Sequence, residues 1–167
     1  DRQICNSMAA QQAAALARWP FKPRRLQLVR NGIDVDEFSL GLSPSNKQPL
    51  LAIGRLYPEK RWDRLISAVG LLAAQGISLH LRFAGDGPLL QTLHSHAKHV
   101  GVAHLIEFLG PRRDIKELLA ESRFLVHTAA EEGCPNVVME AMACGRPVVA
   151  MDAGDVPYLV ENGRTGF

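Results

Sequence analysis

The sequence has few cysteines, no long apolar run and almost no net charge. Its three cysteines, Cys5, Cys134 and Cys144, are odd in number and show no Cys-x-x-Cys spacing. This argues against a disulfide framework and against a zinc site, and it is typical of reduced thiols in the cytoplasm. For Cys134, a packing role is favoured over a reactive one.

Two further absences concern membranes and targeting. No apolar run reaches the roughly 20 residues that span a bilayer. The first residues also do not show the pattern of a secretion signal, in which a charged region is followed by an apolar region and then by small residues. The chain also lacks an initiator methionine and stops just after a turn signal at residues 165–167. We therefore expect a cytoplasmic protein, of which this chain is a piece.

An excess of charge of one sign is missing as well. The chain has 19 Lys and Arg residues against 17 Asp and Glu residues, a net charge of +2. This small and evenly spread charge disfavours nucleic acid or a membrane surface as a partner. With 167 residues, 47% hydrophobic and 22% charged, the chain has the size and composition of one soluble globular domain.

The first 48 residues have no regular alternation of elements. Residues 2–18 are rich in alanine and predict a helix that ends before Pro20. Residues 26–29 predict a short strand, and residues 34–48 predict a loop because Gly, Ser, Pro and Asn are frequent there. We therefore expect residues 1–48 to form an interdomain helix, a short strand and a linker.

From residue 49 onward, apolar runs alternate with segments of helical periodicity. Five runs predict buried strands: 49–56, 79–85, 105–110, 124–129 and 147–152. Helices are predicted between them, the third with Asp114 and Glu117 as a capping box. This alternation predicts an α/β fold, a Rossmann-like doubly wound parallel sheet with helices on both faces and right-handed crossovers. Such sheets bind ligands at the carboxyl ends of their strands, so the important loops start at Gly54, Gly85, Gly110, Thr128 and Asp152.

The loop after the first of these strands, "GRLYPEKRW" (54–62), concentrates positive charge. Pro58 favours a helix start there, which puts Lys60 and Arg61 in the first turn. Cations are disfavoured in that position by roughly 0.3–1 kcal/mol unless an anion lies nearby. A phosphate between Arg55 and Lys60 satisfies this requirement. The alternative, that the basic side chains extend into water, stays open and is favoured for Arg61.

The segment "EEGCPNVVMEAMACGRPVVA" (131–150) places two carboxylates in an apolar setting. Glu132 lies in the loop before a helix that is predicted to begin at Asn136, and Glu140 lies one turn inside that helix. An unpartnered buried carboxylate is costly, so Glu140 must pair with another group or face the cleft. Its two acceptor oxygens suit a vicinal diol such as a ribose, and Glu132 suits hydroxyls of a second sugar. A structural salt bridge from Glu140 to Arg146 stays open.

These motifs together resemble a known family. In order, the matching segments are "NGIDVDEF", "GRLYPEK", "FAGDGPL", "LGP", "EEGCPNVVMEAMACGRPVVA" and "NGRTGF". They resemble the C-terminal, nucleotide-sugar-binding half of retaining glycosyltransferases of family 4, the group 1 glycosyl transferases, which have the GT-B fold. The resemblance runs from Asn31 to the end and implies that residues 49–167 are a donor-binding domain, truncated at its C-terminal end, without its N-terminal acceptor domain.

The resemblance also implies roles for individual residues. Arg55 and Lys60 match the pair that holds the donor diphosphate and stabilises the leaving group, Glu132 matches the acid on the donor sugar, and Glu140 matches the acid on the ribose. We take Arg55, Lys60 and Glu132 as the catalytic candidates. The remaining donor-binding candidates are loop and backbone positions: Gly54, Gly85, Leu109, Gly110, Gly133, Cys134, Pro135, Asn136 and Val137.

The implied reaction is transfer of a hexosyl group from a nucleotide-diphosphate sugar with retention of the anomeric configuration. The acceptor is a glycan or a lipid-linked sugar, as in polysaccharide biosynthesis, and the missing N-terminal half binds it. Two cations and a helix N-terminus stabilise the leaving diphosphate, so no metal and no cofactor is expected. The isolated chain is expected to bind nucleotide without turnover. Peripheral association of the full-length protein with the inner face of the membrane stays open.

Three positions depart from the family pattern. Cys134 stands where an aromatic residue is common, Asp155 replaces the second residue of a Gly-Gly pair, and Tyr158 replaces a common Glu. Two other interpretations also stay open. A GT-B nucleotide-sugar epimerase would act on the donor without an acceptor, and a non-catalytic flavodoxin-like module would use Glu140 only in a salt bridge.

Several apparent motifs carry no prediction. Residues 34–36 form an Asp-x-Asp motif, but in a linker and without the context of a metal–nucleotide site. Residues 94–104 contain four histidines, which we interpret as a solvated face because helical spacing separates most of them. His127 ends a predicted strand beside the cleft and is expected to pack there. Neither a dinucleotide fingerprint nor a P-loop follows any strand.

Overall fold

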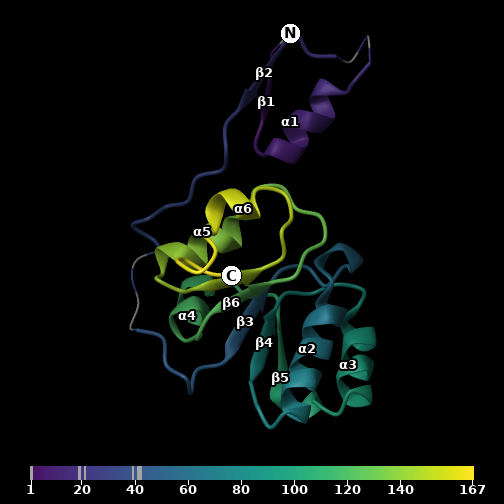
Figure 1. Cartoon of the computed structure of the whole chain (residues 1–167), viewed down its shortest axis with the longest axis vertical. Helices are drawn as coiled ribbons and strands as arrows, with labels where there is room; N and C mark the ends of the chain where they lie inside the picture. The colour runs from purple at the N-terminus through teal and green to yellow at the C-terminus, as the bar shows by residue number, and fades with distance from the viewer. Residues whose placement is uncertain (1, 19, 21, 39, 41–42) are drawn as a thin grey trace.

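A five-stranded parallel sheet forms the centre of the larger part of the molecule (Figure 1). The computed structural model describes residues 2–18, 20, 22–38, 40 and 43–167. The strands are β3 (Leu50–Ile53), β4 (Leu81–Ala84), β5 (Ile106–Gly110), β6 (Leu125–His127) and β7 (Val148–Ala150). They lie in the order β5-β4-β3-β6-β7, and every pair is parallel. The predicted α/β fold is confirmed, with shorter strands than the apolar runs indicated.

Helices cover both faces of this sheet. One face carries α2 (Trp62–Ala74) and α3 (Leu90–His99), and the other carries α4 (Ile115–Ala120), α5 (Asn136–Ala143) and α6 (Val156–Leu159). Two short 3-10 turns, η1 (Pro58–Lys60) and η2 (Ala103–Leu105), lie in the connections. Side chains alternate along β3, so Leu50 packs with the α2 face and Leu51 with the α5 face. Because both faces of the sheet are largely buried, its strands are mostly apolar, with Arg82 of β4 and Glu107 of β5 among the exceptions.

The N-terminal prediction was partly wrong. Residues 2–18 do not form one helix: β1 (Arg2–Cys5) comes first, and α1 spans only Met8–Ala15. Ser7 is the reason for the boundary, because its hydroxyl accepts a hydrogen bond from Ala10 N over 3.1 Å and caps the helix there. β1 pairs in parallel with β2 (Arg25–Leu28), close to the predicted strand at 26–29. Within the predicted loop 34–48, residues 39, 41 and 42 lie outside the described residues.

Two predicted helix starts also differ. Pro58 does begin a helical turn, but it is the single 3-10 turn η1, which contains Lys60 and ends there. Arg61 lies outside that turn, with a left-handed φ of 52°, and α2 begins only at Trp62. Asp114 does precede α4, but its side chain makes no capping hydrogen bond and instead pairs with Arg112. The capping box is therefore not formed, since a strong local cation competes for the carboxylate.

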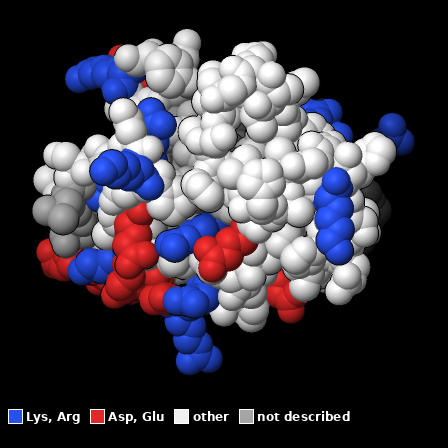
Figure 2. Space-filling view, turned by 90° about the horizontal axis from the view of Figure 1, so that it is seen from below, with Lys and Arg blue, Asp and Glu red and all other residues white. Residues whose placement is uncertain are grey.

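The surface carries both signs of charge side by side. Viewed from below the orientation of Figure 1, basic and acidic side chains alternate around a largely uncharged face (Figure 2). Arg82, for example, pairs with both Glu107 and Glu121. Across the described part of the chain, none of the helices combines the length and the apolar character that crossing a bilayer requires.

Candidate functional site

The strand order creates a crevice between β3 and β6. From β3 the chain builds outward through β4 and β5, then crosses back to β6 and β7 on the other side. The connections leaving β3 and β6 therefore diverge, which is the position where sheets of this kind bind ligands. A pocket of about 600 Å³ lies there. Its lining residues are Asn31, Ile53, Gly54, Arg55, Lys60, His127, Glu132, Cys134, Pro135, Asn136, Val137 and Glu140.

Four predicted site residues do not line this pocket. Gly85 lies directly behind Gly54: a Cβ on Gly85 would come within 2.0 Å of the Gly54 carbonyl oxygen, so only glycine permits this approach. Gly110 accepts a hydrogen bond from Gly85 N over 2.8 Å, and Leu109 packs into the core on the α5 side. Gly133 turns its carbonyl toward Asp155 N, at 2.8 Å. Of these four residues, Gly85 supports the pocket directly through its close approach to the lining residue Gly54.

An ion pair lies at the centre of the pocket. Lys60 Nζ is 2.5 Å from Glu132 Oε2, with 15% and 17% of the two side chains exposed. The same oxygen accepts a hydrogen bond from His127 Nε2 over 3.0 Å. Burial by itself raises the pKa of Glu132. The hydrogen bonds from His127 and Lys60, together with the charges of these two residues, have the larger effect and lower the pKa of Glu132 to about 2. Glu132 is therefore ionised at neutral pH.

Arg55 lies at the rim of the pocket rather than inside it. Its side chain is 71% exposed, and Nη2 lies 3.4 Å from Glu59 Oε1. The guanidinium also lies 5.0 Å from the centre of the Tyr57 ring. Arg61 is not among the residues that line the pocket; its side chain is 34% exposed and pairs with Asp63. Lys60 and Arg55 thus approach the pocket from different depths.

The N-terminus of α5 faces the pocket without a cap. Pro135 is the N-cap residue and makes no side-chain capping hydrogen bond, so the first amides of the eight-residue helix remain available to a ligand. Asn31 Nδ2 donates to Asn136 Oδ1 over 2.8 Å and to the Cys134 carbonyl over 3.2 Å. A linker residue therefore holds this helix start in place, and the helix dipole makes it a favourable position for an anion.

Glu140 lies in α5 and contributes to the pocket wall. Burial, followed by the charge of Glu37, raises the pKa of Glu140. No ion pair of Glu140 is found among the residues that the structure describes, so the alternative of a structural salt bridge to Arg146 is not realised. A half-buried carboxylate without a cationic partner is a suitable acceptor for ligand hydroxyls.

Sequence reasoning missed three lining residues, Asn31, Ile53 and His127. Asn31 was identified only as the first residue of the family-like segment "NGIDVDEF", and Ile53 only as a residue of a predicted strand. His127 is 1% exposed, as expected for a packed residue, but its ring also contacts Glu132. Its position at the end of a strand, five residues before Glu132, was the available signal.

The Asp-x-Asp motif and the histidine-rich stretch do not come together as a metal site. Among the described residues, no group of three His, Cys, Asp or Glu side chains is placed to hold a metal. Asp34 Oδ1 instead accepts hydrogen bonds from the amides of Asp36 and Glu37 and stabilises a turn. In the histidine-rich stretch, His94 packs on Phe108 while His96 contacts Ser67.

Known proteins share this sequence pattern. Residues 47–167 match the family described as glycosyl transferases group 1. The chain is 30% identical over 190 residues to the D-inositol 3-phosphate glycosyltransferase of Streptomyces scabiei, covering 100% of this chain and 42% of that enzyme. It is 32% identical over 153 residues to the amylovoran biosynthesis glycosyltransferase AmsK of Erwinia amylovora, covering 86% of this chain and 38% of that protein.

A solved structure shares the fold. The Anabaena protein HepE, in complex with UDP-glucose, superimposes with a TM-score of 0.82 at 32% sequence identity, covering 98% of this chain and 48% of HepE. The chain therefore spans less than half the length of these relatives.

Proposed function

Because the chain belongs to the glycosyl transferase group 1 family, which its residues 47–167 match, we propose that the pocket between β3 and β6 binds the donor of a retaining glycosyltransferase. The donor is a nucleotide-diphosphate sugar. The observation that carries this proposal is the presence in one pocket of a cation, Lys60, and two different carboxylates. Glu132 is ionised and paired with Lys60, whereas Glu140 has no ion-pair partner among the described residues.

Each part of the donor is proposed to contact a group of complementary charge or hydrogen-bonding character in the pocket. The diphosphate lies between Lys60, Arg55 and the first amides of α5, which together offset its charge. The ribose hydroxyls donate to Glu140, and the sugar hydroxyls donate to Glu132. Because negative charge grows on the departing diphosphate, these fixed positive groups stabilise the transition state more than the ground state. The proposal requires no metal and no cofactor.

We propose uridine as the nucleoside, because HepE, at 32% identity over 98% of this chain, was solved with UDP-glucose. The backbone of Leu109 and Gly110, at the end of β5, is the proposed contact for the base. The sugar is proposed to be a hexose. Its acceptor, a glycan or a lipid-linked sugar as in polysaccharide synthesis, belongs to the activity of the full-length protein, which is proposed to act in the cytoplasm and to associate peripherally with the membrane.

The state of Glu140 favours a donor site over a non-catalytic module. A flavodoxin-like module would keep this carboxylate in a structural salt bridge, and within the described residues no such bridge exists. A protein without a ligand for this position gains nothing from burying an unpaired carboxylate, since burial raises the free energy of its ionised form.

The proposal is tested by calorimetric titration of the chain with UDP, GDP and ADP, with EDTA present. We expect UDP to bind, and binding to weaken at least tenfold in Lys60→Ala and Glu140→Ala. Arg61→Ala is the matched control, because it removes the neighbouring cation, which pairs with Asp63 and does not line the pocket. Equal binding of all three nucleotides by the wild type and all variants, or loss of binding in Arg61→Ala as well, would contradict the proposal.

A further inference from the structure

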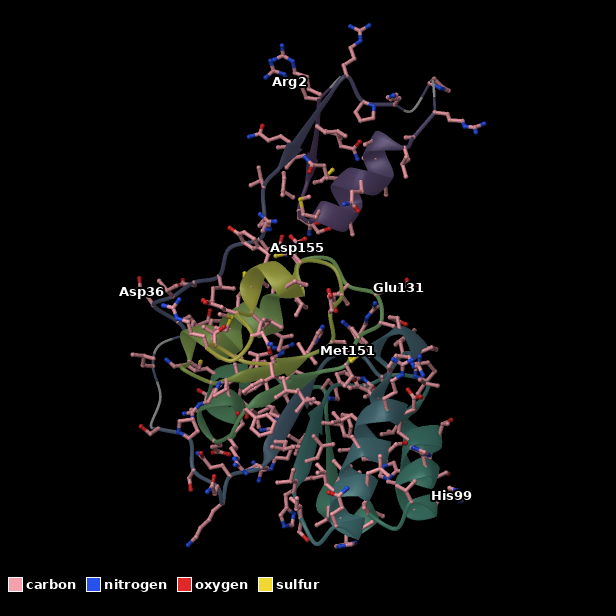
Figure 3. All side chains as sticks on the ribbon, viewed as in Figure 1. Arg2, Asp36, His99, Glu131, Met151 and Asp155 are labelled. Carbon is pink, nitrogen blue, oxygen red and sulfur yellow. The ribbon has the colours of Figure 1, made fainter. Side chains whose placement is uncertain are left out.

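One carboxylate oxygen in the pocket serves two donors. Glu132 Oε2 accepts from Lys60 Nζ at 2.5 Å and from His127 Nε2 at 3.0 Å. The three side chains come from the loop after β3, the end of β6 and the loop before α5. Figure 3 shows this last loop, marked by Glu131, arching over the carboxyl ends of the strands. The two donors differ in how firmly they are held.

His127 is fixed, whereas the Lys60 side chain can change partner. His127 is the last residue of β6, pairs with Ala150 of β7, and is 1% exposed. Lys60 carries its charge on a flexible four-carbon stem that is 15% exposed. Its backbone is nevertheless held, because Thr128 Oγ1 donates to the Lys60 carbonyl over 2.8 Å. The end of β6 therefore anchors both the Glu132 carboxylate and the base of the Lys60 side chain.

A bound diphosphate competes with Glu132 for Lys60. The phosphate carries more negative charge than the carboxylate and lies against the same pocket wall, so the ammonium is drawn toward it. Glu132 then loses its cation while it must still present its second oxygen to the sugar. On the basis of the proposed donor site, we propose that His127 is a positioning residue, which holds the Glu132 carboxylate against the donor sugar while Lys60 turns from Glu132 to the diphosphate.

The tautomer of His127 agrees with this role. An ionised carboxylate only accepts hydrogen bonds, so Nε2 carries the proton that points to Glu132. Nδ1 is buried and has no hydrogen-bond partner among the described residues. A residue that served packing alone would be better replaced by an apolar one, because an unpaired buried nitrogen is unfavourable. The contact between Nε2 and Glu132 is the feature that requires histidine.

The test compares the affinity for UDP with the affinity for UDP-glucose in His127→Leu, His127→Gln and wild type. His127→Leu is expected to bind UDP within about twofold of wild type and to bind UDP-glucose about tenfold more weakly, the loss of one hydrogen bond to a charged group. His127→Gln places an amide N–H near the position of Nε2 and should recover most of this loss. Val126→Ala, in the same strand but without polar contacts, is the control for a general disturbance of β6. Equal affinities of wild type and His127→Leu for UDP-glucose, or a similar loss in Val126→Ala, would overturn the positioning role.

A second measurement separates this inference from the donor site itself. If the wild type binds neither UDP nor UDP-glucose, the donor-site proposal fails. The titration of the Glu132 carboxyl, followed by NMR in the ligand-free chain, then decides whether His127 holds it. His127→Leu should raise the midpoint of that titration, and His127→Gln should raise it less. An unchanged midpoint in His127→Leu would refute the contact.

Discussion

Arg30 Nε donates a hydrogen bond to Asp155 Oδ2 over 2.7 Å, although 125 residues separate them in the chain. The Asp155 side chain is fully buried and also accepts a hydrogen bond from Met8 N over 2.9 Å. The Arg30 guanidinium lies 3.6 Å from the centre of the Tyr158 ring. Asp155 and Tyr158, both departures from the family pattern, thus contact the same arginine.

This cluster joins the N-terminal unit to the candidate site. Asp155 lies where α1 and the strands β1 and β2 meet the larger unit (Figure 3). On its other side, Asp155 N donates to the carbonyl of Gly133, the residue after Glu132. Asp155 therefore connects the linker residue Arg30 with the loop that carries Glu132.

Removal of the Asp155 carboxylate is expected to destabilise the fold. Asp155→Ala leaves Arg30 and the amide of Met8 without their buried acceptor, which costs about 1–3 kcal/mol. For a chain of this size, the melting temperature should fall by about 2–4 °C per kcal/mol. Thermal unfolding followed by circular dichroism measures the change. Asp155→Asn, which keeps one acceptor oxygen, should lose less, and a melting temperature unchanged in both variants would contradict the cluster.

The loop of Glu132 should tolerate no side chain at Gly154. A Cβ there would lie 2.2 Å from the Glu132 carbonyl oxygen, and the residue has a φ of +57°. Gly154→Ala is expected to cost about 1–3 kcal/mol in strain and to displace Glu132. Gly163→Ala is the matched control, because Gly163 has a φ of +76° but no atom within 4 Å of the added Cβ. Urea unfolding should show a larger loss for Gly154→Ala, and only that variant should bind UDP-glucose more weakly.

Glu132 should make stability depend on acid pH. Its pKa falls from the usual 4.5 to about 2 on folding. A lowered pKa stabilises the fold above the unfolded value, and this stabilisation is lost as the pH drops from about 4.5 through about 2. The difference in unfolding free energy between wild type and Glu132→Gln should therefore be constant above about pH 5 and shrink below it. A difference that stays constant down to about pH 2 would contradict the ion pair with Lys60.

Glu140 should lower the stability of the fold at neutral pH while it strengthens the binding of UDP. Because burial and then Glu37 raise its pKa, the ionised carboxylate disfavours the fold, increasingly as the pH rises above the unfolded pKa. Glu140→Gln is expected to raise the melting temperature at about pH 7 and to have no such effect near pH 4. The same variant should bind UDP more weakly, by about tenfold, if ribose hydroxyls donate to the carboxylate. Lower stability at neutral pH would show a structural role instead.

Predictions from sequence were most accurate where the information is local. The apolar runs and helical periodicities placed all five strands of the large sheet and the helices between them. The strand at Arg2–Cys5 was missed because a segment of four residues, paired with a distant strand β2, leaves no periodic pattern of its own. The contact of His127 with Glu132 was missed for a similar reason: the Nε2 atom contacts a carboxylate that the following loop brings back over the strand end.

Short segments of the chain are enough to identify the residues that have the chemistry of the site. The spacing of Glu132 and Glu140, the basic loop before α2 and the uncapped start of α5 are all local properties. The folded chain adds the order of the strands: β3 lies beside β6, which brings Lys60 to Glu132 and His127. Strand order depends on long-range packing of both sheet faces, to which residues distant in the chain contribute, and no local pattern of residues encodes it.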